Sequence, residues 1–416
     1  MPVSGAGRDK KKRFLWVDCC GAAIFCGPNY DRLACPTCTD VCLSETHGCC
    51  RDRNLPVGGL TVPRVSVIIP TYNSAWSVGR TLRSVLHQTL RDFEVIVVND
   101  GSTDDFADAV APFEGDERVR IVHQANMGLA AARNRGIAEA RSALIAPIDA
   151  DDLWHPDFLA ETVSALEGDP DAPFAFAYSF RMDERDFIVP YVTRRRPPRH
   201  DFIGLLSLNS VSCGSAGVYR RYLMLRWGGY DEAMGHAGLQ GAEDWKMILR
   251  LASLGEPILI ERYLVGYRLV PSGMSQIDPG RQLAAVLAVV DDIDREVPGI
   301  PRKILADAET MMRAWLLPAF AHQRLYGRFL VEAFKGYALN PLWFLNAPIR
   351  QLHWYRLEML FRSIGDRLRA GKAKPLHLSE AVVDGRKPFA YLSDDERAPA
   401  SPAAPRERVA ASHEML

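Results

Sequence analysis

No run of 18 or more apolar residues occurs in the chain, which excludes a polytopic membrane protein. The chain also lacks an excess of positive charge. Its 50 Lys and Arg residues balance 51 Asp and Glu residues, which argues against a dedicated nucleic-acid-binding protein. Nor does it have the low hydrophobicity of a disordered chain, since 48% of its residues are hydrophobic and 24% are charged. A length of 416 residues predicts a globular protein of two or three domains.

Cysteine is nearly absent beyond residue 50. Eight of the nine cysteines lie between residues 19 and 50, and the ninth is Cys213. The motif CPTC at residues 35–38 has the spacing of a zinc-ligand pair, so a structural Zn²⁺ site is expected within residues 35–50. The alternative is an extension with reduced thiols. No catalytic role is assigned to residues 1–60.

The N-terminus only faintly resembles a secretion signal. A basic run at residues 10–13 precedes an apolar stretch at residues 14–26, but Asp18 interrupts that stretch and no small-residue cleavage site follows. A disulfide framework would require an oxidising compartment. The sequence therefore favours a cytoplasmic protein.

From residue 65 onward the sequence alternates between buried strands and helices. Strands are expected at 65–69, 93–98, 119–122 and 143–148, with helices at 77–88, 103–113 and 129–140. This alternation predicts a parallel sheet with helices on both faces. Further along, a looser pattern predicts helices at 157–166 and 243–254, strands at 174–180 and 209–219, and a mostly helical region at 281–369.

Polar clusters follow three of the expected strands, at residues 71–74, 99–102 and 149–152. In open parallel sheets, ligands bind beyond the carboxyl ends of the strands. The three clusters therefore predict a ligand site at that edge of the sheet.

Five motifs occur in a fixed order along this region. They are PTYN at 70–73, NDGS at 99–102, NMGL at 126–129 running into ARNRG at 132–136, DADD at 149–152, and GAEDW at 241–245. In this order they resemble family 2 glycosyltransferases with the GT-A fold, from residue 63 to about residue 275. The resemblance implies an α/β domain, with a GT-A-type mostly parallel sheet flanked by helices, over residues 61–276. A Cys-rich extension (1–60) would precede it, and a helical C-terminal region (277–374) and a largely disordered tail (375–416) would follow.

The resemblance assigns the base and ribose of a nucleotide-sugar donor to Asp100 and to Thr71, Tyr72 and Asn73. A carboxylate such as Asp100 can accept a charge-assisted hydrogen bond from an imide N–H of the base. Each residue also has a structural alternative. Asp100 could form a tight turn with Gly101 and cap the following helix, and the other three could simply begin a helix.

Asp149 and Asp151 share one face of an extended segment and are candidate ligands of Mg²⁺ or Mn²⁺. These ions take one or two carboxylates and complete their coordination with substrate phosphate oxygens. The family pattern places Asp149 near the ribose and adds Ala150 to the donor site. The alternative is an acidic helix start with Asp152 as its N-cap.

Two arginines are candidate partners of the donor diphosphate. Arg133 lies in an Ala-rich helix that should be buried, where a guanidinium needs an anion; a structural ion pair with Asp149 or Asp100 is the alternative. Arg268 precedes a loop that folds over the diphosphate in similar enzymes, and its planar fork suits phosphate.

Asp244 is the candidate general base, because the family's Glu-Asp dipeptide supplies one, and Glu243 is the fallback. The alternative for Asp244 is a carboxylate that interacts with the dipole of a helix start. Trp245 could stack on a sugar ring, although such aromatics more often pack in the core.

Together these residues predict a metal-dependent inverting glycosyltransferase that moves a sugar from a nucleotide sugar, expected to be a UDP-sugar, to a hydroxyl of a saccharide or lipid-linked acceptor. One alternative is a nucleotidyltransferase of similar architecture, but the Gly- and Arg-rich loop of those enzymes is missing after the first strand. Another is a non-catalytic interaction protein that uses the Cys-rich segment.

Residues 343–374 combine aromatic and basic side chains. A basic amphipathic helix can lie on an anionic membrane surface, so peripheral contact with the inner face of a membrane is expected through this segment. The alternative is a terminal helix packed on the catalytic domain.

Overall fold

The computed structural model describes residues 62–189, 200–211, 213–270, 278–342, 376–378, 381 and 388–389, and two short paired strands, β1 (Trp16–Val17) and β2 (Ala23–Ile24). The chain divides into two units, residues 1–60 and residues 61–416. The expected zinc site at 35–50 and the basic segment 343–374 lie outside the described residues. All five sequence motifs belong to the second unit.

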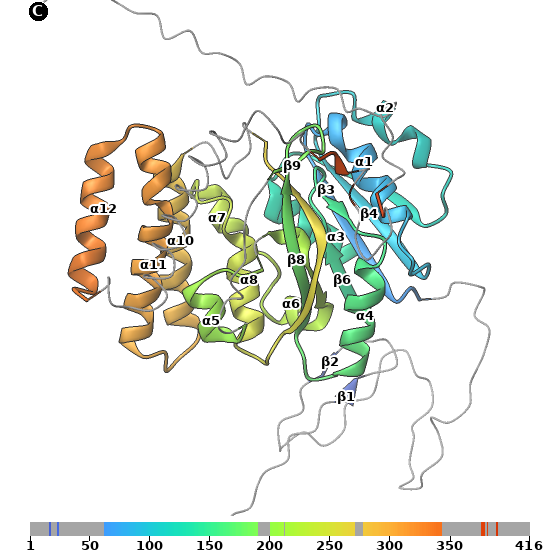
Figure 1. The fold of residues 1–416 in the computed structure, drawn as a ribbon. Coiled ribbons are helices and arrows are strands. Elements are labelled where there is room, and N and C mark those ends of the chain that lie inside the picture. Colours follow the sequence, from blue (N-terminus) through green and yellow to red (C-terminus); the bar gives the residue numbers. More distant parts are fainter. Residues whose placement is uncertain are drawn as a thin grey trace, which may run out of the picture. The chain divides into compact units, whose positions relative to one another are not determined.

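A mixed sheet forms the centre of this second unit, with the strand order β5-β4-β3-β6-β10-β8-β11-β7 and β9 paired to β8 (Figure 1). Strands β5, β4, β3 and β6 are parallel, β10 runs antiparallel between β6 and β8, and β11 is parallel to β8. The prediction of a mostly parallel sheet is confirmed. The strands are β3 (Val65–Thr71), β4 (Phe93–Asp100), β5 (Val119–Gln124), β6 (Leu144–Pro147), β7 (Leu153–Trp154), β8 (Phe174–Met182), β9 (Ile188–Val189), β10 (Gly217–Arg220) and β11 (Ile258–Arg268).

Helices cover the sheet and continue beyond it (Figure 1). They are α1 (Ala75–Leu86), α2 (Phe106–Val110), the 3-10 turn η1 (Ala111–Phe113), α3 (Leu129–Glu139), α4 (Phe158–Gly168), α5 (Phe202–Ser207), the 3-10 turn η2 (Gly214–Ala216), α6 (Arg221–Arg226), α7 (Glu232–His236), α8 (Glu243–Ala252), α10 (Pro279–Glu296), α11 (Arg302–His322) and α12 (Tyr326–Leu339). None of the helices in the described residues has the length and hydropathy to cross a bilayer.

Three sequence predictions need correction. The strand expected at 209–219 is only β10, because η2 occupies the residues before it. The helix expected from residue 103 begins at Phe106. The strand β11 was not expected. Its sequence ILIERYLVGYR includes charged residues, and its pairing with β8 shifts register twice. Each shift interrupts the alternation of apolar and polar positions by which a strand is predicted.

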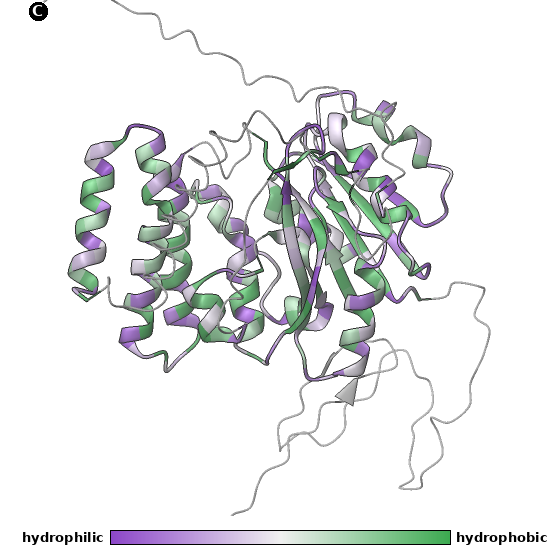
Figure 2. Ribbon diagram, in the orientation of Figure 1, coloured by the Kyte–Doolittle hydropathy of each residue, from purple (hydrophilic) through white to green (hydrophobic). Residues whose placement is uncertain are grey.

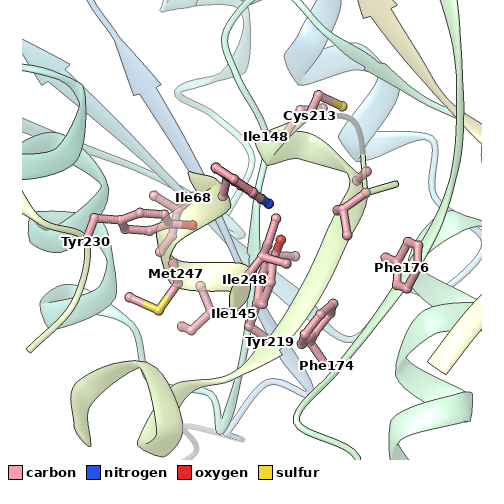
Figure 3. Close-up of a cluster of buried hydrophobic side chains, with 14 of the residues drawn as sticks. Ile68, Ile145, Ile148, Phe174, Phe176, Cys213, Tyr219, Tyr230, Met247 and Ile248 are labelled. Carbon is pink, nitrogen blue, oxygen red and sulfur yellow. The ribbon is translucent and has the colours of Figure 1, made fainter. Parts of the chain in front are cut away.

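Every residue of β3 and β4 is buried, as their uninterrupted apolar sequences predict. Helix α3 approaches β3 closely at Gly136, where a Cβ atom would lie 2.3 Å from Cγ2 of Ile68. The close-up of the core shows Met247 and Ile248 of α8 beside Ile145 of β6 (Figure 3). The core therefore fixes α8 against the central strands, on which the predicted site depends.

Helix α10 is bound to α8 by buried cations as well as by apolar packing. Lys246 forms ion pairs with Asp231 (2.5 Å) and Asp292, and Arg250 binds Glu296 through two hydrogen bonds of 2.6 and 2.7 Å. Helix α11 packs on α10, and α12 packs on α11 (Figure 1). The C-terminal helices are thus anchored to α8, whose second residue is the candidate base Asp244.

A few described residues of the C-terminal segment pack on the sheet, and the prediction of a largely disordered tail over residues 375–416 stays a prediction. Leu378 and Phe389, each 1% exposed, join Leu153 and Met182 in a small apolar cluster. The Leu378 N–H donates to the Asp186 carbonyl at 2.9 Å.

We expect Leu378→Ala to destabilise the protein by about 2 kcal/mol, because it removes a buried side chain and leaves a cavity. Leu376→Ala is the matched control: Leu376 is 46% exposed, so its truncation should change the free energy of unfolding by less than about 0.5 kcal/mol. Urea unfolding of both variants measures the difference. Equal effects would show that the C-terminal segment does not contribute to the folded core.

Candidate active site

The first two polar clusters of the sequence are joined by hydrogen bonds at the carboxyl ends of β3 and β4. The Asn73 side-chain oxygen accepts from the Thr103 N–H (2.8 Å), and the Asn73 N–H donates to Ser102 Oγ (3.1 Å). Asn73 adopts a φ of 49°, which asparagine tolerates better than most residues. Thr71 is buried and Tyr72 is 50% exposed. The geometry leaves the Tyr72 ring available to a base or ribose, and that role remains a prediction.

Asp100 ties its own loop to the next motif. Its carboxylate accepts hydrogen bonds from the Gln124 side chain (2.8 Å) and from the N–H groups of Met127 (2.9 Å) and Gly128 (2.8 Å). It does not cap the following helix, so that alternative is wrong. Three of about four acceptor positions on the carboxylate are used by the protein, and base recognition by Asp100 remains a prediction.

The acidic cluster after β6 is held from two sides. Ser215 Oγ accepts from the Asp149 N–H at 3.0 Å and donates to Asp152 at 2.5 Å, while the Arg268 N–H donates to the other Asp152 oxygen at 2.9 Å. Asp152 is fully buried, and the alternative in which it caps a helix is wrong, since β7 follows it directly and α4 begins only at Phe158. Asp152 therefore shapes the loop that presents its neighbours.

Asp149 and Asp151 remain partly exposed on this loop, with Ala150 buried between them. Burial and the charge of Asp149 raise the pKa of Asp151 to about 6, against the lowering effect of Arg268. The part of this shift that comes from the negative charge of Asp149 would also favour a cation placed between the two carboxylates.

The two carboxylates fit Mg²⁺ or Mn²⁺ only together with a substrate. Within the described residues no group of three or more His, Cys, Asp or Glu side chains could hold a metal ion. One or two carboxylates plus diphosphate oxygens are the set that Mg²⁺ prefers, so Asp149 and Asp151 suit an ion that arrives with the donor.

The Arg268 side chain is turned into the protein and bound to the acidic loop. Its side chain is fully buried, its Nε donates to the Asp151 carbonyl (2.6 Å), and its Nη1 forms an ion pair with Asp186 (2.6 Å) and donates to the Asp183 carbonyl (2.9 Å). Burial lowers the pKa of Arg268. The predicted diphosphate contact is corrected accordingly: Arg268 fixes the backbone of the acidic loop.

Arg133 connects the acidic loop to the start of α8. Its guanidinium, 2% exposed, contacts Asp149 (2.6 Å) and Glu243 (2.9 Å) and lies over the ring of Tyr230 at 5.2 Å from the centroid. Of the two alternatives for a structural ion pair, Asp149 or Asp100, the structure has Asp149, and Glu243 is an additional partner that was not expected. A Cβ atom on Gly214 would lie 2.8 Å from Arg133 Nη2 and 3.6 Å from the Asp244 Cβ, so all three residues meet at one point. The diphosphate role of Arg133 remains a prediction.

Asp244 has the properties of a proton acceptor. It is half-buried, and burial together with the charge of Glu243 raises its pKa to about 7, with Arg133 opposing. The N-cap position of α8 belongs to Ala242, so Asp244 is not the cap. Glu243 is less suited as a fallback base, because it is buried and accepts from both Arg133 and the Gly241 N–H (2.7 Å).

Trp245 belongs to the core. It is 2% exposed, and its indole N–H donates to the Leu205 carbonyl at 3.0 Å. The expectation that it stacks on a sugar is corrected on this ground.

Sequence reasoning missed two residues that build the site. Ser215 joins Asp149 to Asp152, and Asn134 binds the Tyr230 backbone in both directions (2.7 and 2.9 Å). The ARNRG motif drew attention to the segment that contains Asn134. The sequence could not indicate the partner, because Tyr230 is about 100 positions away. Nothing local in the sequence marks Ser215.

Comparison with known proteins agrees with this arrangement. Residues 66–226 match the family model described as "Glycosyl transferase family 2". Uncharacterized glycosyltransferase EpsJ of Bacillus subtilis is 36% identical over 137 residues, 32% of this chain and 40% of that protein. Validoxylamine A glucosyltransferase of Streptomyces hygroscopicus is 38% identical over 129 residues, 30% of this chain and 31% of that protein. An uncharacterized glycosyltransferase of Rickettsia conorii is 44% identical over 105 residues, 25% of this chain and 17% of that protein.

The matched segments thus span well under two thirds of these relatives' lengths. Among solved structures, Staphylococcus aureus TarS 1–349 in complex with UDP-GlcNAc aligns with a TM-score of 0.50 at 18% identity, over 78% of this chain and 95% of that chain. That likeness concerns the fold and supports the GT-A expectation. The family match, together with the motifs at the strand ends, shows that residues 66–226 carry a glycosyltransferase family 2 domain.

Proposed function

We propose that the chain is a metal-dependent inverting glycosyltransferase that uses a nucleotide sugar, specifically a UDP-sugar, and a hydroxyl acceptor on a saccharide or lipid-linked molecule. The observation that carries the proposal is the bridge made by Arg133. One buried guanidinium binds Asp149, at the donor end, and Glu243, next to the candidate base. The bridge thus brings the donor carboxylate Asp149 and the start of α8, which carries the candidate base, to one place, and a single displacement needs the base close to the donor.

The residues divide the reaction between them. Asp244 removes the proton from the acceptor hydroxyl, and the resulting oxygen forms a bond to the anomeric carbon. On the opposite face the bond from that carbon to the diphosphate oxygen breaks, and the nucleoside diphosphate leaves with the electron pair. A divalent ion held by Asp149 and Asp151 would supply charge neutralisation for the leaving diphosphate.

The nucleotide assignment has two supports. Tyr72 is exposed at the end of β3, next to the Asn73 and Ser102 loop contact, where a base could lie. The TarS structure of similar fold is a complex with UDP-GlcNAc. For the whole chain we propose that residues 61–276 are the transferase domain, that 277–374 extend it, and that 1–60 take no part in the chemistry.

Binding of UDP tests the metal part of this proposal. We expect micromolar to millimolar affinity in calorimetry with Mg²⁺ or Mn²⁺, and at least tenfold weaker binding after treatment with EDTA, because the diphosphate and the two carboxylates repel each other without the ion. Asp151→Asn should weaken the metal-dependent part. Asp171→Asn is the matched control. Asp171 is exposed and precedes β8, so it lies at the amino end of that strand, whereas the site lies at the carboxyl ends of the parallel strands.

Undiminished binding in EDTA would remove the metal from the mechanism. A screen of isotope-labelled nucleotide sugars for slow hydrolysis then identifies the donor independently of the acceptor. If no nucleotide sugar binds or is hydrolysed, the transferase proposal itself fails.

A further inference from the structure

A group of buried charges joins the hairpin between β8 and β9 to the acidic loop (residues 149–152). Figure 2 shows the central strands β3 and β4 coloured mainly as apolar, and these charges contrast with that interior. Asp186 is fully buried and forms ion pairs with Arg80 of α1 and with Arg268 of β11 (2.6 Å), whose side chains are 6% and 0% exposed. A guanidinium is costly to bury without an anion, so both cations depend in part on this one carboxylate.

Arg268 connects Asp186 to the acidic loop. Its Nη1 contacts the Asp186 carboxylate, its Nε donates to the Asp151 carbonyl at 2.6 Å, and its backbone N–H donates to the Asp152 carboxylate at 2.9 Å. The guanidinium is planar and rigid, so an anion that fixes Nη1 also fixes the direction in which Nε points. A single side chain therefore separates Asp186 from the backbone of Asp151, a candidate metal ligand.

The hairpin and the C-terminal segment hold Asp186 from two sides. Its φ is 64°, a region that aspartate enters more readily than most residues but still at a cost. The Asp186 N–H donates to the Asp183 carbonyl at 3.2 Å, and the Asp183 carboxylate accepts from the Phe187 N–H at 2.9 Å, which closes the turn. The Leu378 N–H donates to the Asp186 carbonyl at 2.9 Å. A backbone held in this way gives the carboxylate a defined direction toward its partners.

We propose that Asp186 is a positioning residue for the acidic loop. It aligns Arg268, and Arg268 holds the Asp151 backbone where the carboxylates of Asp151 and Asp149 can share one cation. Asp186 itself is assigned no contact with the donor or the ion. The role in metal binding rests on the proposed function, whereas the alignment of the loop does not. Removing a residue that orients a metal ligand from behind typically weakens metal binding by about 10- to 100-fold, so the effect is large enough to measure.

Asp186→Asn tests the proposal in the full chain. Asparagine has the shape of aspartate and tolerates a positive φ, so the turn should persist while the ion pair with Arg268 is lost. We expect amide hydrogen exchange in residues 149–153, measured by mass spectrometry without any ligand, to become about tenfold faster. In UDP calorimetry, the Mn²⁺ concentration needed for half-maximal binding should rise about tenfold, and excess Mn²⁺ should restore the UDP affinity.

Arg313→Gln is the matched control for the loss of a buried ion pair. Arg313 of α11 pairs with Glu332 of α12, and the two side chains are 12% and 3% exposed. This variant should lower the melting temperature, but hydrogen exchange in residues 149–153 and the Mn²⁺ requirement should stay as in the wild type. A role of Asp186 in stability alone would give the same pattern in Asp186→Asn and would overturn the proposal.

Arg268→Lys is the second variant, and it decides the question if Asp186→Asn does not fold. It keeps a buried positive charge beside Asp186, but an ammonium lacks the planar fork that binds Asp186 and the Asp151 carbonyl together. Both effects on the loop are therefore expected here as well. Unchanged exchange in residues 149–153 of the folded variants would overturn the proposal, and so would an unchanged Mn²⁺ requirement. If the wild type shows no metal-dependent UDP binding, the proposed function fails, and faster exchange in the variants still supports the alignment of the loop by Asp186.

Discussion

Asp244→Asn is expected to lower sugar transfer by about 10² or more while leaving UDP affinity within a few-fold of the wild type. The amide cannot accept the acceptor's proton, whereas the donor diphosphate is assigned to Asp149, Asp151 and the metal. The side chain is half-buried beside Gly214, and asparagine has the same shape, so the fold should be kept. Turnover and UDP calorimetry on the same preparation measure the two effects separately.

The pH profile provides a second check on Asp244. Its pKa is raised to about 7 from an ordinary value of 3.8, and a base must be deprotonated to act. The value of kcat/KM should therefore rise with pH and level off above about 7. The raised pKa also has a cost in stability. Between pH 4 and 7 the folded chain keeps a proton that the unfolded chain has lost, so this group's contribution to the free energy of unfolding falls as the pH rises.

A matched control separates catalysis from the loss of a negative charge at a helix start, since Asp244 lies in the first turn of α8. Asp278 is the N-cap of α10 and accepts from the N–H groups of Gly280 (2.7 Å) and Arg281 (3.2 Å). Asp278→Asn removes such a charge outside the site and should change the free energy of unfolding by about 1 kcal/mol at most. Glu243→Gln is unsuitable for this purpose, because it removes one of Arg133's two anions. Near-normal turnover of Asp244→Asn would exclude Asp244 as the base.

The parallel half of the sheet and its strand ends could be predicted because the information is local. A buried parallel strand is a continuous apolar run, and the cluster that follows it must lie at the sheet's carboxyl edge; β3 and β4 satisfy both conditions. Strand β11 could not be predicted in this way. It contains charged residues, and its pairing with β8 shifts register twice, so its sequence is neither a continuous apolar run nor a regular alternation.

Side-chain roles were harder to predict than positions. Arg268 and Trp245 occupy the expected segments, yet both side chains turn into the protein, and burial depends on what other segments pack against them. The sequence also showed that Arg133 would need an anion, but only the fold brings Glu243, 110 positions away, to within 2.9 Å of it. Long-range partners of buried charges have no signature in local spacing.

Arg133→Gln is expected to destabilise the protein by about 3–5 kcal/mol. It removes a cation that contacts both Asp149 and Glu243, and it leaves the 5%-exposed Glu243 carboxylate without this ion pair. The charge of Arg133 also lowers the pKa of Asp244. In the variant, the rise of kcat/KM should therefore move to a pH above about 7. Urea unfolding and a pH–rate profile measure both consequences.

A second substitution distinguishes a specific bridge from general packing. If Glu243 is the anion left uncompensated, adding Glu243→Gln to Arg133→Gln should recover part of the lost free energy of unfolding, because a neutral amide is cheaper to bury than an unpaired carboxylate. A double-mutant cycle then gives the coupling between the two residues. Activity should not recover with stability, since Asp149 has still lost its cation and the pKa of Asp244 is still changed. An Arg133→Gln variant as stable as the wild type, with an unmoved pH profile, would mean that the bridge does not organise the site.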